Sequence, residues 1–173
     1  MNPIITLHRP PFFLSVNVTT AGVLLGLAKA AAEVFLERLP GRTIAYTDYA
    51  SQQEAPITHL QVGTAAMQIG EAEFRARHAA TVVDRKAVIA EPWTISERVQ
   101  VRLDVSATCL RAKDAIDILA TASGASSIYY DVPIQRIDRD IRAAHQHASL
   151  HPNTAIELYG RVICGLEPNT TNL

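Results

Sequence analysis

The sequence has no surplus of either charge and few cysteines. Its 173 residues include 16 Lys and Arg and 17 Asp and Glu, which gives a formal net charge of −1 at pH 7. A protein that binds a phosphate backbone usually carries a basic excess, so nucleic acid is not an expected partner. Cys109 and Cys164 lie in apolar surroundings without CxxC spacing. We interpret both as small buried hydrophobic side chains in a reducing, cytoplasmic compartment.

Long apolar runs and a signal peptide are also missing. No uninterrupted apolar run approaches the roughly 20 residues that span a bilayer, so no membrane segment is expected. The N-terminal stretch is interrupted by Pro3, Pro10 and Pro11 and lacks a basic region before an apolar one, which argues against a secretory signal. We expect residues 1–173 to form a single domain, with an extended lead-in over 1–17 and a flexible tail over 167–173.

Helical periodicity is the main pattern that the chain does contain. Thr19 or Thr20 is a plausible N-cap for an Ala- and Leu-rich helix over 21–39, which stops at Pro40 and Gly41. A connection over 41–55 follows, and it is longer than most loops.

Pro56 suits the first turn of a second helix, predicted over 56–90 and ended by Pro92. Its apolar residues fall on two stripes, and its length is typical of a helix in a bundle. The first stripe is Ile57, Leu60, Met67 and Phe74, and the second is Val62, Ala65, Ile69, Ala72, Ala76 and Val83.

A third helix is predicted to start at Thr94 or Ser96 and to extend to Ser123. Thr94 and Glu97 form a T-x-x-E capping box, and Gly124 supplies the residue after the helix end. Apolar residues alternate with polar ones over 99–105, which is strand periodicity, so a strand is the alternative there. We favour a helix buried on both faces, because the helical pattern continues beyond this stretch without a turn signal.

The last part of the chain predicts two shorter helices. Pro133 opens one that extends through residue 147 and ends near His151, and Thr154 with Glu157 forms a capping box before a short helix over 155–165. The predicted fold class is therefore all-α: an antiparallel up-and-down four-helix bundle with a short extra C-terminal helix.

Three histidines invite a metal interpretation that their spacing opposes. His145, His147 and His151 lie within seven residues. The first two could share a metal only on a strand and the last two only on a helix, so no metal ligand is assigned and ordinary helical histidines are the main interpretation. Histidine is nevertheless the side chain best suited to move a proton near neutral pH.

Two other stretches have both a structural and a ligand-binding interpretation. Arg136, Arg139 and Asp140 belong to a charged run that forms either a solvated helix face or a phosphate clamp. The small residues of 123–127 form either a helix stop or a loop through which a ligand approaches the backbone closely.

Residues 123–165, SGASSIYYDVPIQRIDRDIRAAHQHASLHPNTAIELYGRVICG, carry a family resemblance. A Gly/Ser/Ala turn, a P-x-Q-R-x-x-R-D helix start, an A-x-x-H step and a following Pro and Y-G-R resemble the final segment of flavin-dependent two-component monooxygenases in the acyl-CoA dehydrogenase superfamily. A fainter likeness extends to 21–37, to Arg42 and to Pro56, so the resemblance covers nearly the whole chain as one C-terminal domain.

The resemblance implies a flavin-dependent oxidoreductase module. By that likeness His147 is the acid or base near flavin and substrate, and FMN or FAD is the cofactor. The same likeness implies flavin contacts from Arg42, Ser123, Gly124, Ala125 and Ser126.

The resemblance also implies partners. Family members pack these helical domains into a homo-oligomer, a dimer or a tetramer, and they have further flavin-binding domains. Here either a separate chain supplies those domains, or the gene is truncated, or this domain has another role. His59 departs from the pattern, because the family has glutamine at that point. The alternative is a non-catalytic helical oligomerisation or interaction domain.

Overall fold

The computed structural model describes residues 11–173, and every regular element in this range is helical. The long helices are α2 (Phe12–Arg38), α3 (Pro56–Ile89) and α4 (Ile95–Ala122), followed by the shorter α5 (Pro133–His145) and α6 (Pro152–Ile163). Short 3₁₀ turns occur at η1 (Leu39–Gly41), η2 (Gln52–Glu54) and η3 (Ala125–Ile128). The all-α prediction is confirmed.

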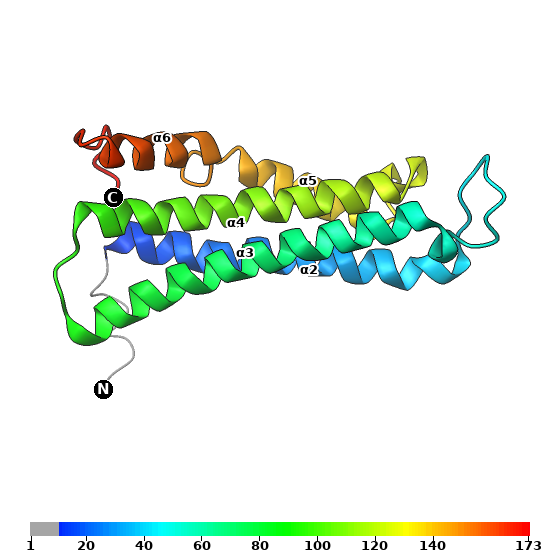
Figure 1. Ribbon diagram of the computed structural model, residues 1–173, viewed down its shortest axis with the longest axis horizontal. Coiled ribbons are helices and arrows are strands. Elements are labelled where there is room, and N and C mark those ends of the chain that lie inside the picture. The colour runs from blue at the N-terminus through cyan, green and yellow to red at the C-terminus, as the bar shows by residue number, and fades with distance from the viewer. Residues whose placement is uncertain (1–10) are drawn as a thin grey trace.

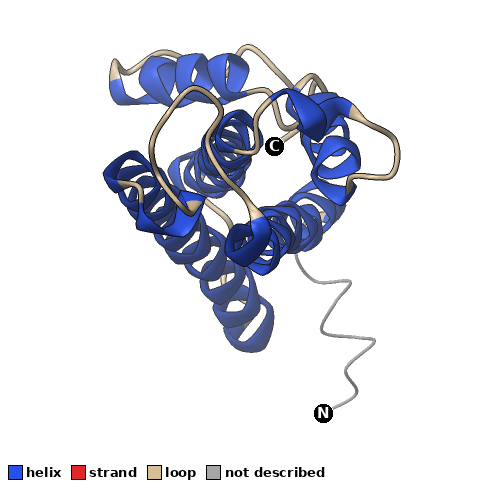
Figure 2. Ribbon diagram, turned by 90° about the vertical axis from the view of Figure 1, so that its right-hand side faces the viewer, coloured by secondary structure: helices blue, strands red, loops and turns tan. Residues whose placement is uncertain are grey.

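The helices lie lengthwise beside one another. In Figure 1 α2, α3 and α4 alternate in direction, and α5 and α6 follow one another back along α4. Figure 2 shows the long helices nearly end-on, gathered into a bundle. The helix predicted as an appendage, α6, therefore shares the fourth position of the bundle with α5.

Helix α4 is the centre of the bundle, since it contacts α2, α3, α5 and α6. Its buried apolar side chains point in several directions; they are Val99, Val101, Val105, Cys109, Ala112, Ala115, Ile116 and Leu119. The prediction of a helix buried on both faces is confirmed, and the strand alternative over 99–105 is wrong. Neighbours on opposite sides of one helix produce the alternating apolar pattern.

The predicted start of α3 and both predicted ends of α4 are confirmed. Pro56 stands in the first turn of α3, and Gly124, with φ +69°, follows the end of α4. The Glu97 amide donates to Thr94 Oγ1 (3.2 Å), while the Thr94 amide donates to Glu97 Oε2 (2.9 Å). Lys86 adds an ion pair to Glu97 (2.7 Å), and this contact, followed by the Thr94 amide, lowers the pKa of Glu97 to about 2.

Helix α2 starts earlier than predicted. It begins at Phe12, so both the start at Thr19 or Thr20 and the extended lead-in are wrong for residues 12–17, and the rest of the lead-in lies outside the described residues. The Thr19 and Thr20 hydroxyls donate to carbonyls four residues earlier, those of Ser15 and Val16. Threonine inside a helix makes this bond, and a sequence does not distinguish it from a cap.

By length and composition the helical segment Phe12–Gly41, which is α2 with η1, could cross a membrane, with a mean hydropathy of 1.5 over its most apolar window. Core helices of bundles have the same composition, and α2 has buried residues on one face, Leu14, Asn17, Ala21, Leu24, Ala28, Ala31 and Phe35. That face packs against α3, α4 and α5.

The two apolar stripes of α3 have different environments. Ala65, Ala72, Ala76 and Val83 are buried in the bundle. The other stripe, which we call the outer stripe, is 55–72% exposed and consists of Ile57, Leu60, Met67 and Phe74. The fold therefore buries one of the two predicted stripes and leaves the other exposed.

The boundary between α5 and α6 also differs from the prediction. Helix α5 ends at His145, and a turn follows in which the amides of Leu150 and His151 donate to the His147 carbonyl (2.9 and 3.0 Å). Helix α6 begins at Pro152, not at a capping box: the Thr154 hydroxyl donates to the His151 carbonyl (2.9 Å). A proline in the first turn starts the helix without a side-chain cap.

The C-terminal segment, predicted to be flexible, lies against α4 and α6. Arg161 donates to the Glu167 carbonyl (3.1 Å), and Asn169 donates to Glu157 (2.9 Å). Arg102 donates to the Asn172 carbonyl (2.8 Å). These bonds hold the segment beside the start of α4 and of α2, where Figure 1 places the C-terminal end.

A buried carboxylate joins α3 to α4. Asp104 is fully buried, and its two oxygens meet Arg75 Nη1 (2.9 Å) and His78 Nδ1 (2.7 Å). Gln100 donates a further bond to Asp104 (3.2 Å). The carboxylate is thus satisfied by groups from both helices, which fixes how they pack.

Candidate functional site

Arg42 ties the loop after α2 to the end of α4. Its Nη2 donates to the Ser123 carbonyl (2.5 Å) and approaches Ser126 Oγ (3.5 Å). Gln52 reinforces this link, because its amide donates to the Arg42 carbonyl (2.7 Å) and its Nε2 donates to the Ala122 carbonyl (2.8 Å). We call this group, Arg42, Gln52, Ser123, Gly124, Ala125 and Ser126, the Arg42 junction.

Gly124 gives the junction its shape. Its φ of +69° and ψ of −174° lie in a region that only glycine adopts readily, and they turn the chain out of α4 into η3. Gly124 and Ala125 are exposed, Arg42 and Ser126 are half-buried, and Ser123 is buried. Burial, and then the nearby Arg38, lower the pKa of Arg42. A half-buried cation beside exposed backbone is suited to bind an anion.

The structure brings Arg42 and the four predicted residues of 123–126 together. Gln52 was not predicted as a site residue, although it is buried and makes two of the bonds that hold the junction. Only an indirect indication of its role is present in the sequence: the connection over 41–55 is unusually long, and long loops are often functional.

His147 lies in the exposed turn between α5 and α6. Its Nδ1 accepts from the Ser149 amide (3.3 Å) and lies 2.9 Å from Ser149 Oγ. Because Nδ1 is an acceptor, the neutral ring carries its proton on Nε2. The ring borders a hollow of about 440 Å³ between α4, α6 and the C-terminal segment.

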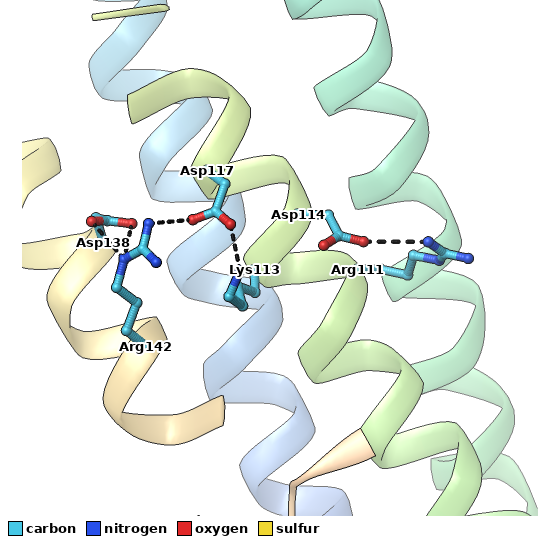
Figure 3. A network of polar contacts seen from close by, with 6 residues as sticks. All are labelled: Arg111, Lys113, Asp114, Asp117, Asp138 and Arg142. Atoms are coloured by element: carbon cyan, nitrogen blue, oxygen red, sulfur yellow. Dashed lines mark hydrogen bonds and ion pairs between the residues drawn. The ribbon is translucent and has the colours of Figure 1, made fainter. Parts of the chain in front are cut away.

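A network of charges fixes the helix that leads to His147 (Figure 3). Arg142 on α5 pairs with Asp117 on α4 (2.6 Å) and with Asp138 one turn earlier (3.0 Å). Lys113 also pairs with Asp117. Three isoleucines of α5 are buried beneath these pairs, so both the core and the surface hold α5 on α4.

The two areas are far apart in one chain. The 13 residues of α5 separate the Gly124 turn from His147, and at about 1.5 Å per residue the helix alone spans roughly 20 Å. In Figure 1 the end of α4 lies at the right, whereas the turn between α5 and α6 lies toward the other end. The chain therefore does not bring His147 to the Arg42 junction.

The remaining candidate residues form no site. His145 and His151 lie with ring centroids 5.7 Å apart, and each has a buried Nδ1 without a hydrogen-bond partner. Burial, followed by Lys113, lowers the pKa of His145. No group of three metal-binding side chains occurs within residues 11–173. Arg136 and Arg139 are exposed on α5, as expected of a solvated face.

The predicted environment of the cysteines holds for one of them. Cys109 is buried in α4, and burial raises its pKa to about 11. Cys164 is exposed, so its prediction is wrong; it lies just beyond the end of α6, where no further element covers it.

Known proteins are similar to this chain in sequence and fold. The family described as "Acyl-CoA dehydrogenase, C-terminal domain" matches residues 18–152. The flavin-dependent monooxygenase oxygenase subunit HsaA of Mycobacterium tuberculosis is 28% identical over 166 residues, which are 95% of this chain and 42% of that protein. HsaA of Rhodococcus jostii is 27% identical over 161 residues, again 42% of its length.

Solved structures of similar proteins also match this chain. XiaF from Streptomyces sp., in complex with FADH2 and glycerol, superposes with a TM-score of 0.89 at 34% identity, over 93% of this chain and 41% of XiaF. The 3-HSA hydroxylase of Rhodococcus sp. has a TM-score of 0.78 at 24% identity, which shows a shared fold. The chain thus spans less than half the length of these relatives.

Proposed function

Because this chain belongs to the family of acyl-CoA dehydrogenase C-terminal domains, we propose that it is the helical module of a flavin-dependent monooxygenase. The relatives named above include oxygenase subunits of flavin-dependent monooxygenases and a protein in complex with FADH2. The observation that carries the proposal is the Arg42 junction, where the residues with a predicted flavin contact meet.

The junction fits the phosphate of a flavin nucleotide, either FMN or FAD. Arg42 offers a guanidinium that is already oriented by the Ser123 carbonyl, and Ser126 adds a hydroxyl. Gly124 is exposed and has no side chain, so a ligand can approach the backbone there. Phosphate is the natural ligand of such a group because its bonds to a guanidinium are charge-assisted.

His147 would serve the reaction as the proton carrier. When bound, a reduced flavin supplies the electrons for oxygen transfer to a substrate. The Ser149 amide holds His147 Nδ1 as an acceptor, which leaves Nε2 to give a proton to, or take one from, a group in the adjacent hollow. This role makes the turn after α5 the acid–base element of the chain.

Turnover would require further polypeptide. Since the relatives are more than twice as long, we propose that the remaining flavin-binding domains come from a separate chain or another part of the protein. We also propose a cytoplasmic homo-oligomer, a dimer or a tetramer, in which the outer stripe of α3 is covered. Exposed apolar residues at helical spacing are typical of such interfaces.

Flavin titration tests the role of Arg42. The chain, alone and with the chain that supplies the other domains, is titrated with FMN, FAD and riboflavin while flavin fluorescence anisotropy is followed. Arg42→Gln should weaken binding of FMN and FAD by about 10- to 100-fold, the value of a hydrogen bond to a charged group, and should leave riboflavin unchanged.

Arg139→Gln is the matched control, because Arg139 is exposed on α5 and has only a long contact with Asp140 (3.8 Å). It should bind all three flavins as the unaltered chain does. Equal losses of FMN and riboflavin in Arg42→Gln would contradict a phosphate contact.

The second candidate function is a non-catalytic oligomerisation domain, which the exposed outer stripe alone would explain. The two candidates differ at His147. In the complete flavin-loaded assembly, His147→Ala should lower the rate of substrate oxygenation and change its pH profile if His147 carries a proton. An unchanged rate and profile, with oligomers intact by light scattering, would favour the non-catalytic role.

A further inference from the structure

The hollow beside His147 contains a second chemical group that the proposed function does not use. Its walls come from the start of α2, from α4, from the turn after α5 and from α6, and the C-terminal segment runs along it. We call it the His147 pocket and define it by Phe13, Arg102, His147, Glu157, Leu158 and Asn172.

Arg102 is a buried cation whose hydrogen-bond partner, the Asn172 carbonyl, is neutral. It is only 6% exposed, yet none of the ion pairs within residues 11–173 includes it, and residues 1–10 contain no Asp or Glu. Its Nη1 donates to the Asn172 carbonyl (2.8 Å), while its buried Nε has no partner. Buried arginines are normally paired, because removing the charge from water is costly. Arg102 also lines the hollow, so an anionic ligand bound there would supply a charged partner in place of a neutral one.

The surroundings of Arg102 define the rest of that ligand. The guanidinium carbon lies 5.2 Å from the centroid of the Phe13 ring, and Leu158 supplies a second apolar wall. Glu157 is the carboxylate that faces the same hollow, and it is already engaged by Asn169 (2.9 Å) and by Arg161 (3.8 Å). A ligand with an anionic oxygen and a ring-sized apolar body matches this combination of groups.

The C-terminal segment occupies the position that such an anion would take. Its Asn172 carbonyl is a neutral acceptor for Arg102, and a main-chain oxygen of Leu173 lies 3.5 Å from Arg98 Nη1. A carboxylate would bind the same guanidinium more strongly, because charge-assisted bonds are roughly twice as strong as neutral ones. The bonds that hold the segment are individually modest, so a ligand can displace them.

We propose that the His147 pocket binds a small carboxylate with an apolar body, whose carboxylate pairs with Arg102 in place of the Asn172 carbonyl. The segment 169–172 is then a strap that competes with the ligand. This inference rests on the proposed function in one respect, namely that the bound carboxylate is a substrate within reach of His147. Binding of the carboxylate itself requires no flavin.

Calorimetric titration of the flavin-free chain with benzoate and with its neutral isostere benzamide tests the pairing. Benzoate should bind at least tenfold more tightly than benzamide. Arg102→Gln should remove that preference, and Arg102→Lys should keep part of it, since it retains the charge but loses the planar fork. Arg136→Gln, on the exposed face of α5, is the matched control and should behave as the unaltered chain.

A shortened chain that ends at Glu167 tests the strap. It should bind benzoate several-fold more tightly, and in the full chain benzoate should speed hydrogen exchange of the amides of 169–173. Equal affinity for benzoate and benzamide, or an undiminished preference in Arg102→Gln, would overturn the carboxylate assignment. Weaker benzoate binding by the shortened chain would overturn the strap.

These outcomes remain decisive if Arg102→Gln fails to fold, because the benzoate preference and the shortened chain do not depend on it. Failure of this proposal can also be distinguished from failure of the proposed flavin site. Benzoate binding with no flavin binding would refute only the role of the Arg42 junction, and flavin binding without a benzoate preference would refute only the role of Arg102.

Discussion

Replacing Gly124 with alanine should destabilise the fold through the backbone alone. With φ of +69° and ψ of −174°, Gly124 lies in a region where a residue with a Cβ costs about 1–3 kcal/mol. Space is not the obstacle, because the nearest atom to an added Cβ would be Arg42 Nη2 at 3.7 Å, an ordinary van der Waals distance. Gly124→Ala should therefore lower the free energy of unfolding by about 1–3 kcal/mol.

Urea unfolding followed by far-UV circular dichroism measures this change. Gly22→Ala is the control: Gly22 is exposed within α2, and nothing lies within 4 Å of an added Cβ. Alanine should stabilise that helix by about 0.5–1 kcal/mol, so the two glycine substitutions should have opposite signs. If Gly124→Ala is as stable as the unaltered chain, the turn does not depend on the positive φ and the reasoning is refuted.

Three further predictions concern the core, the caps and the thiols. Arg75→Ala should lower the unfolding free energy by about 2 kcal/mol in the same urea assay, less than for a fully buried pair, because Arg75 is 44% exposed while Asp104 is fully buried. The contacts of Glu97 lower its pKa from 4.5 to about 2. The stability that its ionised carboxylate contributes is therefore fully present above pH 4.5 and is lost as the pH falls toward 2. The stability difference between the unaltered chain and Glu97→Gln should therefore shrink over that range. Ellman's reagent at pH 8 should label Cys164 in the native chain and reach buried Cys109, with its pKa of about 11, only after denaturation.

Local sequence signals predicted the start of a helix wherever one or two residues fix the backbone conformation there. Pro56 starts α3 and the Thr94–Glu97 box starts α4, because a missing amide proton and a short polar side chain act within one turn. The start of α2 was missed because Thr19 looks like a cap, whereas its hydroxyl bonds back to Ser15 inside a helix. Only packing decides between these two uses of threonine.

The candidate site was predictable in part, and only where a known family pattern gave the residues. The bonded partners Arg42 and Ser123 lie 81 positions apart in the sequence, a separation that no local pattern spans. Gln52 and Arg102 were not predicted, because a glutamine in a loop and an arginine on a helix are usually solvated, and only the fold shows that these two are buried.

The separation of the two areas limits how the chain can act. Groups about 20 Å apart cannot touch the same reacting atom, so the Arg42 junction and His147 serve different parts of an extended ligand or different ligands. The outer stripe begins at Ile57, directly after the loop that carries Gln52, so a neighbour that covered the stripe would lie against the junction. His147 and Arg102 lie instead among α4, α6 and the C-terminal segment. Association at the Ile57 end of α3 should therefore affect binding at the junction.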